Sequence, residues 1–122
     1  MKSLTPLLHV QDMLESLSFY QFLGFELEQR MPDEGTPSWV YLVQGSVHLM
    51  LQAVEESLAE SRLERDIEQD LVLHIGHSDL IAFHAALSEE GLPVTDLNDD
   101  GLVEFMIRDP DGYALVFFFD EE

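Results

Sequence analysis

The chain has 122 residues and carries 25 Asp and Glu against 5 Lys and Arg, which gives a formal net charge of −20. A surface this acidic repels phosphate backbones and anionic lipid, so nucleic-acid binding and membrane binding are not expected. Hydrophobic residues make up 46% of the chain and cysteine is absent, so we expect one folded domain without disulfides, thiolate nucleophiles or cysteine-based zinc sites. No secretory or membrane-spanning apolar run is present, which favours a cytoplasmic location.

The first half of the chain predicts a strand, a helix and three further strands. Residues 4–10 have strand character, and Asp12 is a good N-cap for a helix that Gly24 ends. Glu15 is placed to complete a capping box with Asp12. The further strands are expected at residues 25–31, 39–43 and 47–51, the last two joined by a tight turn at Gly45.

The second half repeats this order after a charged segment, residues 55–69, which we expect to form a short surface helix. A strand at 71–75 precedes a helix with Ser78 as its N-cap and Gly91 at its end. A short strand at 93–97 is expected next, and a closing hairpin follows it.

The turn of the closing hairpin is the clearest local signal in the chain. Pro110 sets the φ angle that the second position of a turn needs, and Gly112 supplies a left-handed exit. Asp109 can accept hydrogen bonds from the backbone N–H groups just after it. The apolar, β-rich runs on both sides of Asp109–Gly112 therefore predict two paired strands.

The two halves of the chain also match each other. Leu8-His9-Val10 aligns with Leu73-His74-Ile75 at an offset of 65 residues, and Gly45 aligns with Gly112 at an offset of 67. With Phe19-Tyr20…Leu23-Gly24-Phe25 and Arg108-Asp109-Pro110-Asp111-Gly112, the whole chain resembles the vicinal-oxygen-chelate superfamily, in its glyoxalase and bleomycin-resistance branch. The resemblance implies an α+β fold, in which residues 1–122 form a single domain of two βαβββ modules. The modules, at about 1–54 and 70–122, would form a curved mixed sheet around a concave cleft.

Metal-dependent members of that superfamily hold an ion with four side chains, two from each module. The resemblance places these positions at Thr5, Leu49, Asp70 and Val116. Aliphatic side chains cannot donate to a metal ion, so we predict a metal-free member with no cofactor and no catalytic residues. An unconventional site in which His9 and His74 join Asp70 is the alternative, whereas hydrogen-bonded, inert strand-end histidines are the simpler interpretation.

The candidate ligand-binding residues are those that strand alternation and the resemblance place on the concave face. They are Leu7, His9, Trp39, Tyr41, Val47, Leu49, Leu51, Asp70, Val72, His74, Glu104, Val116 and Phe118. The remaining histidines, His48, His77 and His84, are interpreted as structural because they alternate away from this face or fall in helical positions.

An apolar cleft with aromatic edges in a strongly acidic protein suits a ligand that is part aromatic and part cationic. The resemblance to bleomycin-resistance proteins implies sequestration by binding alone, in clefts shared by the subunits of a homodimer. The alternative is a metal-dependent enzyme of the glyoxalase or fosfomycin-transferase kind, which Leu49 and Val116 disfavour. A small-molecule sensor on the same scaffold is a third interpretation.

Overall fold

The computed structural model describes residues 1–55, 71–98 and 103–121. The chain divides into two compact units, Met1–Ala59 and Glu60–Glu122. Most of the predicted linker helix, together with Asp70, lies outside the described residues. No helix in the described parts of the chain is long and apolar enough to cross a membrane.

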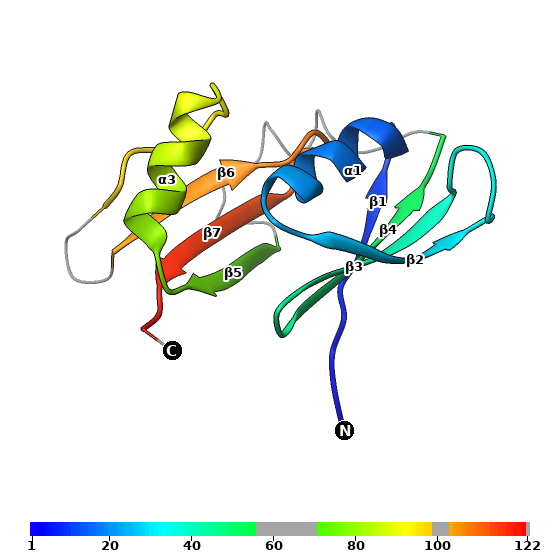
Figure 1. The fold of residues 1–122 in the computed structure, drawn as a ribbon, viewed down its shortest axis with the longest axis horizontal. Helices are drawn as coiled ribbons and strands as arrows, with labels where there is room; N and C mark the ends of the chain where they lie inside the picture. The colour runs from blue at the N-terminus through cyan, green and yellow to red at the C-terminus, as the bar shows by residue number, and fades with distance from the viewer. Residues whose placement is uncertain (56–70, 99–102, 122) are drawn as a thin grey trace. The chain divides into compact units, whose positions relative to one another are not determined.

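Unit 1 contains a helix and a four-stranded sheet (Figure 1). The sheet has the order β1-β4-β3-β2, with β1 parallel to β4 and the other pairs antiparallel. A bulge interrupts the pairing of β2 with β3 between Leu27 and Gln29. In chain order the elements are β1 (Leu7–Val10), α1 (Met13–Phe22), β2 (Glu26–Met31), β3 (Trp39–Gln44) and β4 (Val47–Ala53).

Helix α1 begins and ends where the sequence predicts. The Asp12 side chain accepts a hydrogen bond from the Glu15 backbone N–H at 3.2 Å, and Gly24 follows the helix with a φ of 111°, which suits glycine. Leu14, although apolar, is 55% exposed. The buried positions are Met13, Ser16 and Tyr20, because these recur at helical spacing on the side that packs against the sheet.

The hydrophobic core of unit 1 lies between α1 and one face of the sheet. Strand register puts alternate residues of β1, β4 and β3 on this face, since Leu8 of β1 and Val40 of β3 both pair with Leu51 of β4. All of these side chains are buried: Leu8, Val10, Val40, Leu42, Leu49 and Leu51. We call the opposite side of each sheet, which none of the described helices of its own unit covers, the helix-free face.

Unit 2 is built on a three-stranded sheet of order β5-β7-β6, in which β5 is parallel and β6 antiparallel to β7. Its elements are β5 (Val72–His77), α3 (Leu80–Glu89), β6 (Glu104–Arg108) and β7 (Ala114–Phe119) (Figure 1). The described residues thus form two helices and two mixed sheets, and the predicted α+β fold is confirmed.

The short strand predicted at residues 93–97 is not formed. Thr95 does lie beside β6: its N–H donates to the Met106 carbonyl at 2.9 Å, and Asn98 forms an isolated bridge with Glu104. The Met106 N–H, however, donates to the Thr95 hydroxyl at 2.8 Å instead of to a backbone carbonyl. A side-chain acceptor therefore replaces the regular ladder, as threonine in an irregular segment often does.

Helix α3 covers the other side of the unit 2 sheet through aromatic contacts. The Phe83 ring centroid lies 5.0 Å from that of Phe117 and 6.1 Å from that of Phe105. The prediction of Ser78 as the N-cap is wrong, because Asp79 occupies that position. Its side chain makes no capping bond, and its own backbone N–H donates to His77 Nδ1 at 2.9 Å.

The Asp109–Gly112 turn forms by the predicted mechanism. The buried Asp109 carboxylate accepts hydrogen bonds from the backbone N–H groups of Asp111, at 3.0 Å, and Tyr113, at 2.8 Å. Gly112 has a φ of 85°, and its carbonyl accepts a bond from the Arg108 guanidinium at 2.7 Å. One carboxylate thus satisfies two buried amides that the irregular backbone leaves without strand partners.

The two helix N-termini provide a matched test of capping. We expect Asp12→Ala to lower the free energy of unfolding by about 1 kcal/mol, because the side chain that accepts the Glu15 amide is lost. Asp79→Ala is the control and should cost only a few tenths of that amount, since Asp79 makes no side-chain capping bond. Urea denaturation of both variants measures the difference, and equal losses would contradict the assignment.

Candidate functional site

The helix-free face of unit 1 carries two rows of side chains that the strand register brings side by side. In the first row Leu7 pairs with Met50, which pairs with Tyr41. In the second row His9 pairs with Gln52, which pairs with Trp39. Four predicted site residues, Leu7, His9, Trp39 and Tyr41, therefore share this face.

The placement of Val47, Leu49 and Leu51 on the same face is wrong. Leu49 and Leu51 are buried on the side that α1 covers, and Val47 alternates in phase with them. The error came from aligning Gly45 with Gly112. The loop between the paired residues Gln44 and Val47 has two residues, Gly45–Ser46, whereas the loop between Arg108 and Ala114 has five, Asp109–Tyr113. Residues at the same distance after Gly45 and after Gly112 therefore lie on opposite faces of their sheets.

This shift brings an unexpected histidine to the face. His48, predicted to alternate away from it, lies beside Tyr41, and the Tyr41 hydroxyl is hydrogen-bonded to His48 Nδ1 at 2.7 Å. The two rings meet edge to face with centroids 5.7 Å apart, and the Trp39 centroid lies 6.3 Å from that of Tyr41. Trp39, Tyr41 and His48 thus form a continuous aromatic surface, which we call the aromatic row.

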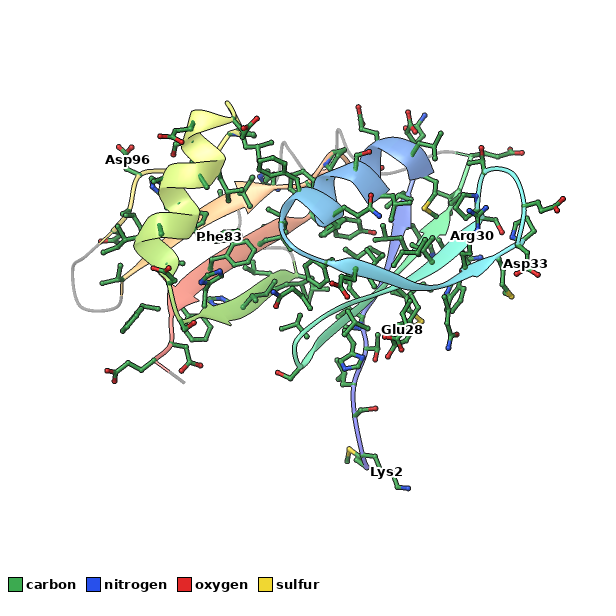
Figure 2. The ribbon with its side chains drawn as sticks, in the orientation of Figure 1. Lys2, Glu28, Arg30, Asp33, Phe83 and Asp96 are labelled. Atoms are coloured by element: carbon green, nitrogen blue, oxygen red, sulfur yellow. The ribbon has the colours of Figure 1, made fainter. Side chains whose placement is uncertain are left out.

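A hollow of about 560 Å³ adjoins this row at the edge strand β2. Figure 2 labels three of its charged side chains, Glu28, Arg30 and Asp33, on β2 and the loop after it. Arg30 donates from Nε to the Pro32 carbonyl at 3.0 Å and also donates to the Gly35 carbonyl, so its guanidinium is engaged by the loop. The lining residues are Leu27, Glu28, Gln29, Arg30, Met31, Asp33 and Trp39.

The helix-free face of unit 2 holds the second group of predicted residues. His74 pairs with Val116, which pairs with Met106 on the other side. Two residues after Val116 in β7, Phe118 pairs with Glu104. Two residues before Val116, Ala114 pairs with Val72. Val72, His74, Glu104, Val116 and Phe118 therefore share one face, as predicted for them by strand alternation.

A smaller hollow of about 200 Å³ opens on this face, between β6 and the segment that runs beside it. Its walls combine apolar side chains with the carboxylates of Asp96 and Glu104, and Figure 2 labels Asp96 on that segment. His84 of α3 holds the segment in place through a 2.8 Å hydrogen bond from Nε2 to the Thr95 carbonyl. The lining residues are Thr95, Asp96, Asn98, Glu104, Phe105, Met106 and Val116.

His77 and His84 both have structural contacts. His77 Nδ1 accepts a hydrogen bond from the Asp79 backbone N–H, and the His77 ring stacks on the Phe83 ring with centroids 4.4 Å apart. The His84 ring meets Phe105 edge to face at 4.8 Å. These contacts fit the structural interpretation of both residues.

The described residues do not fit a metal ion. No three His, Cys, Asp or Glu side chains in residues 1–55, 71–98 and 103–121 lie close enough together to hold one. On the helix-free faces, the central positions of β4 and β7 are Met50 and Val116, a thioether and an alkyl group. Neither is a ligand for zinc, iron or manganese in the nitrogen- and oxygen-rich sites that such enzymes use. Asp70 belongs to the residues outside the described ranges.

The sequence of the chain matches one family model, and the match extends over residues 4–117. That model is described as the glyoxalase/bleomycin resistance protein/dioxygenase superfamily. The chain belongs to this superfamily. Among curated protein sequences none matches it significantly.

Solved structures agree on the fold. TioX from Micromonospora sp. ML1 is 20% identical with a TM-score of 0.77, over 98% of each chain. The bleomycin-binding protein of bleomycin-producing Streptomyces verticillus, complexed with copper(II)-bleomycin, is 21% identical with a TM-score of 0.68, over 99% of this chain and 98% of that one. Lactoylglutathione lyase from Agrobacterium tumefaciens is 15% identical with a TM-score of 0.68, over 99% of this chain and 96% of that one. Identities this low establish the shared fold alone, since one scaffold hosts binding proteins and enzymes.

Sequence reasoning missed several residues of these faces. Met50 and His48 were missed because the more apolar set of β4 was assigned to the cleft. The helix-covered face of a sheet is the more apolar one, so the alternation of His48, Met50 and Gln52 with three aliphatic residues was itself a usable signal. Glu28, Asp33 and Asp96 line hollows formed by irregular backbone, for which the sequence carries no comparable signal.

Proposed function

We propose that this protein binds a small molecule that is both cationic and aromatic, and sequesters it without chemical conversion. One observation supports this: each unit has a hollow beside an edge strand of its sheet, where apolar side chains are joined by carboxylates. In unit 1 the apolar side chains are those of Trp39 and Met31, and the carboxylates are those of Glu28 and Asp33. An aromatic ring gains contact area from the first pair, and a positive charge is attracted by the second.

Binding without chemistry is favoured over the enzymatic alternative because no three His, Cys, Asp or Glu side chains of the described residues lie close enough together to hold a metal ion. Met50 and Val116 occupy strand centres where a Lewis-acid site would need donors. The bleomycin-binding relative provides a precedent for sequestration on this fold. We further propose a homodimer, and a cytoplasmic location remains a prediction from the sequence.

Salt titration separates the two parts of the proposed affinity. We expect proflavine, a planar cationic acridine, to bind more weakly as sodium chloride rises, because salt screens carboxylates such as Glu28 over roughly 8–10 Å. Glu28→Gln should flatten the salt dependence. Trp39→Ala should lower affinity about tenfold at every salt concentration, since it removes ring contact that salt does not screen.

Fluorescence titration of the wild type and both variants measures these effects. Leu14→Ala is a matched control for an exposed apolar residue remote from the helix-free face, and it should bind like the wild type. Salt-independent binding would mean that the acidic charge serves solubility alone. Unchanged affinity in Trp39→Ala would overturn the proposed site in unit 1.

A further inference from the structure

The hydrogen bond between Tyr41 and His48 has a direction that matters for any ligand on the aromatic row. Its length, 2.7 Å from the Tyr41 oxygen to His48 Nδ1, leaves a single proton between the two atoms. A phenol can donate or accept, and Nδ1 of a neutral imidazole accepts when Nε2 carries the proton. An imidazole nitrogen is a far stronger base than a phenol oxygen, so with neutral histidine the phenol donates.

That direction defines what Tyr41 offers to its surroundings. With its proton directed to His48, the phenol oxygen can only accept further hydrogen bonds. Tyr41 is half-buried and its ring lies between those of Trp39 and His48, so its oxygen lies within a surface suited to a flat ring. Met50, its neighbour in the same row, adds a polarizable side chain but no donor.

We propose that Tyr41 selects among aromatic ligands by accepting a hydrogen bond from an N–H group on the ligand ring, and that His48 keeps Tyr41 in the accepting state. The ligand class is an aromatic amine, in preference to its N-alkylated counterpart of the same charge. This inference rests on the proposed function, and it adds a residue and a bond that decide which cationic aromatic compounds bind.

The carboxylates named near His48 within unit 1 come from β2. Glu26 pairs with Val43, which in turn pairs with His48, and Glu28 lies at the nearby bulge. Their attraction for a cationic ligand is the same whether or not that ligand carries N–H groups, so a ratio of two affinities cancels it.

The test compares proflavine with acridine orange, which has the same charged acridine ring but methyl groups in place of the amine hydrogens. We measure both dissociation constants by fluorescence at pH 7.5. Tyr41→Phe, which keeps the ring and removes the oxygen, sets the baseline ratio for the two dyes. The wild type should prefer proflavine about fivefold over that baseline, the effect of one hydrogen bond.

His48→Gln and His48→Phe distinguish the role of the histidine from a structural one. The glutamine amide oxygen can accept the Tyr41 proton, so His48→Gln should keep the proflavine preference, whereas His48→Phe offers no acceptor and should lose it. A wild-type ratio equal to that of Tyr41→Phe would overturn the inference and leave the proposed function standing. A preference that persists in His48→Phe would overturn the role of His48. If neither dye bound the wild type, the proposed function would fail and the inference with it.

Discussion

Replacing Leu51 with alanine is expected to lower the free energy of unfolding by about 2–5 kcal/mol. Leu51 is 0% exposed and lies between Leu8 on β1 and Val40 on β3, in the face that α1 covers. Truncation removes three buried carbon atoms and leaves a space that the neighbouring strands cannot close without losing their register. Urea denaturation with a fixed slope measures the loss.

Met50→Ala is the matched control, since Met50 is adjacent in the chain but lies on the helix-free face beside Leu7 and Tyr41. It should cost well under half as much stability, because Met50 is only partly buried. It should also weaken proflavine binding, whereas Leu51→Ala at a temperature where it stays folded should not. The reverse pattern would mean that the two faces of β4 have been exchanged.

Replacing Asp109 with alanine should cost about 3 kcal/mol of stability. The side chain is 5% exposed and accepts hydrogen bonds from the amides of Asp111 and Tyr113. Without it two amides that are largely shielded from water lose a charged acceptor, and each such loss costs about 1–3 kcal/mol. Thermal and urea unfolding measure the effect.

Asp109→Asn is the conservative comparison, because an amide oxygen can occupy the position of Oδ1 and keep both bonds, although without the charge. We expect it to lose less than half as much stability as the alanine variant. A loss as large as that of Asp109→Ala would show that the charge, and not the hydrogen-bond geometry, stabilises the turn.

Several features of this protein were determined by short stretches of sequence. The cap at Asp12, the helix end at Gly24 and the turn at Asp109–Gly112 form as predicted because each depends on a side chain and backbone groups within about four residues of it. On unit 2 the face on which Val116 lies followed correctly from the turn, since Val116 is in β7 only four positions after Gly112. The family and the α+β fold followed from the order of these local signals.

Which residues of β4 face helix α1 was decided only by tertiary structure. Alternation divides Val47–Ala53 into two sets correctly, but it does not say which set α1 covers. A two-residue loop before β4 and a five-residue loop before β7 reverse the phase of the two hairpins, so an alignment of their glycines exchanges the sets. The more apolar set faces the helix because that face is removed from water completely, and this places Leu51 in the core and His48 beside Tyr41.

The hollows and the Tyr41–His48 bond also depend on contacts between segments that are distant in sequence. Thr95 reaches β6 through Met106 and is held by His84 from the helix, so the hollow beside Glu104 needs three separate segments to be folded. Tyr41 meets His48 because the tight turn at Gly45 sets the pairing of β3 with β4. Local sequence determines where α1 begins and ends and where the turn of the closing hairpin forms. The pairing of those elements, driven by burial of the more apolar faces, determines which side chains meet in a site.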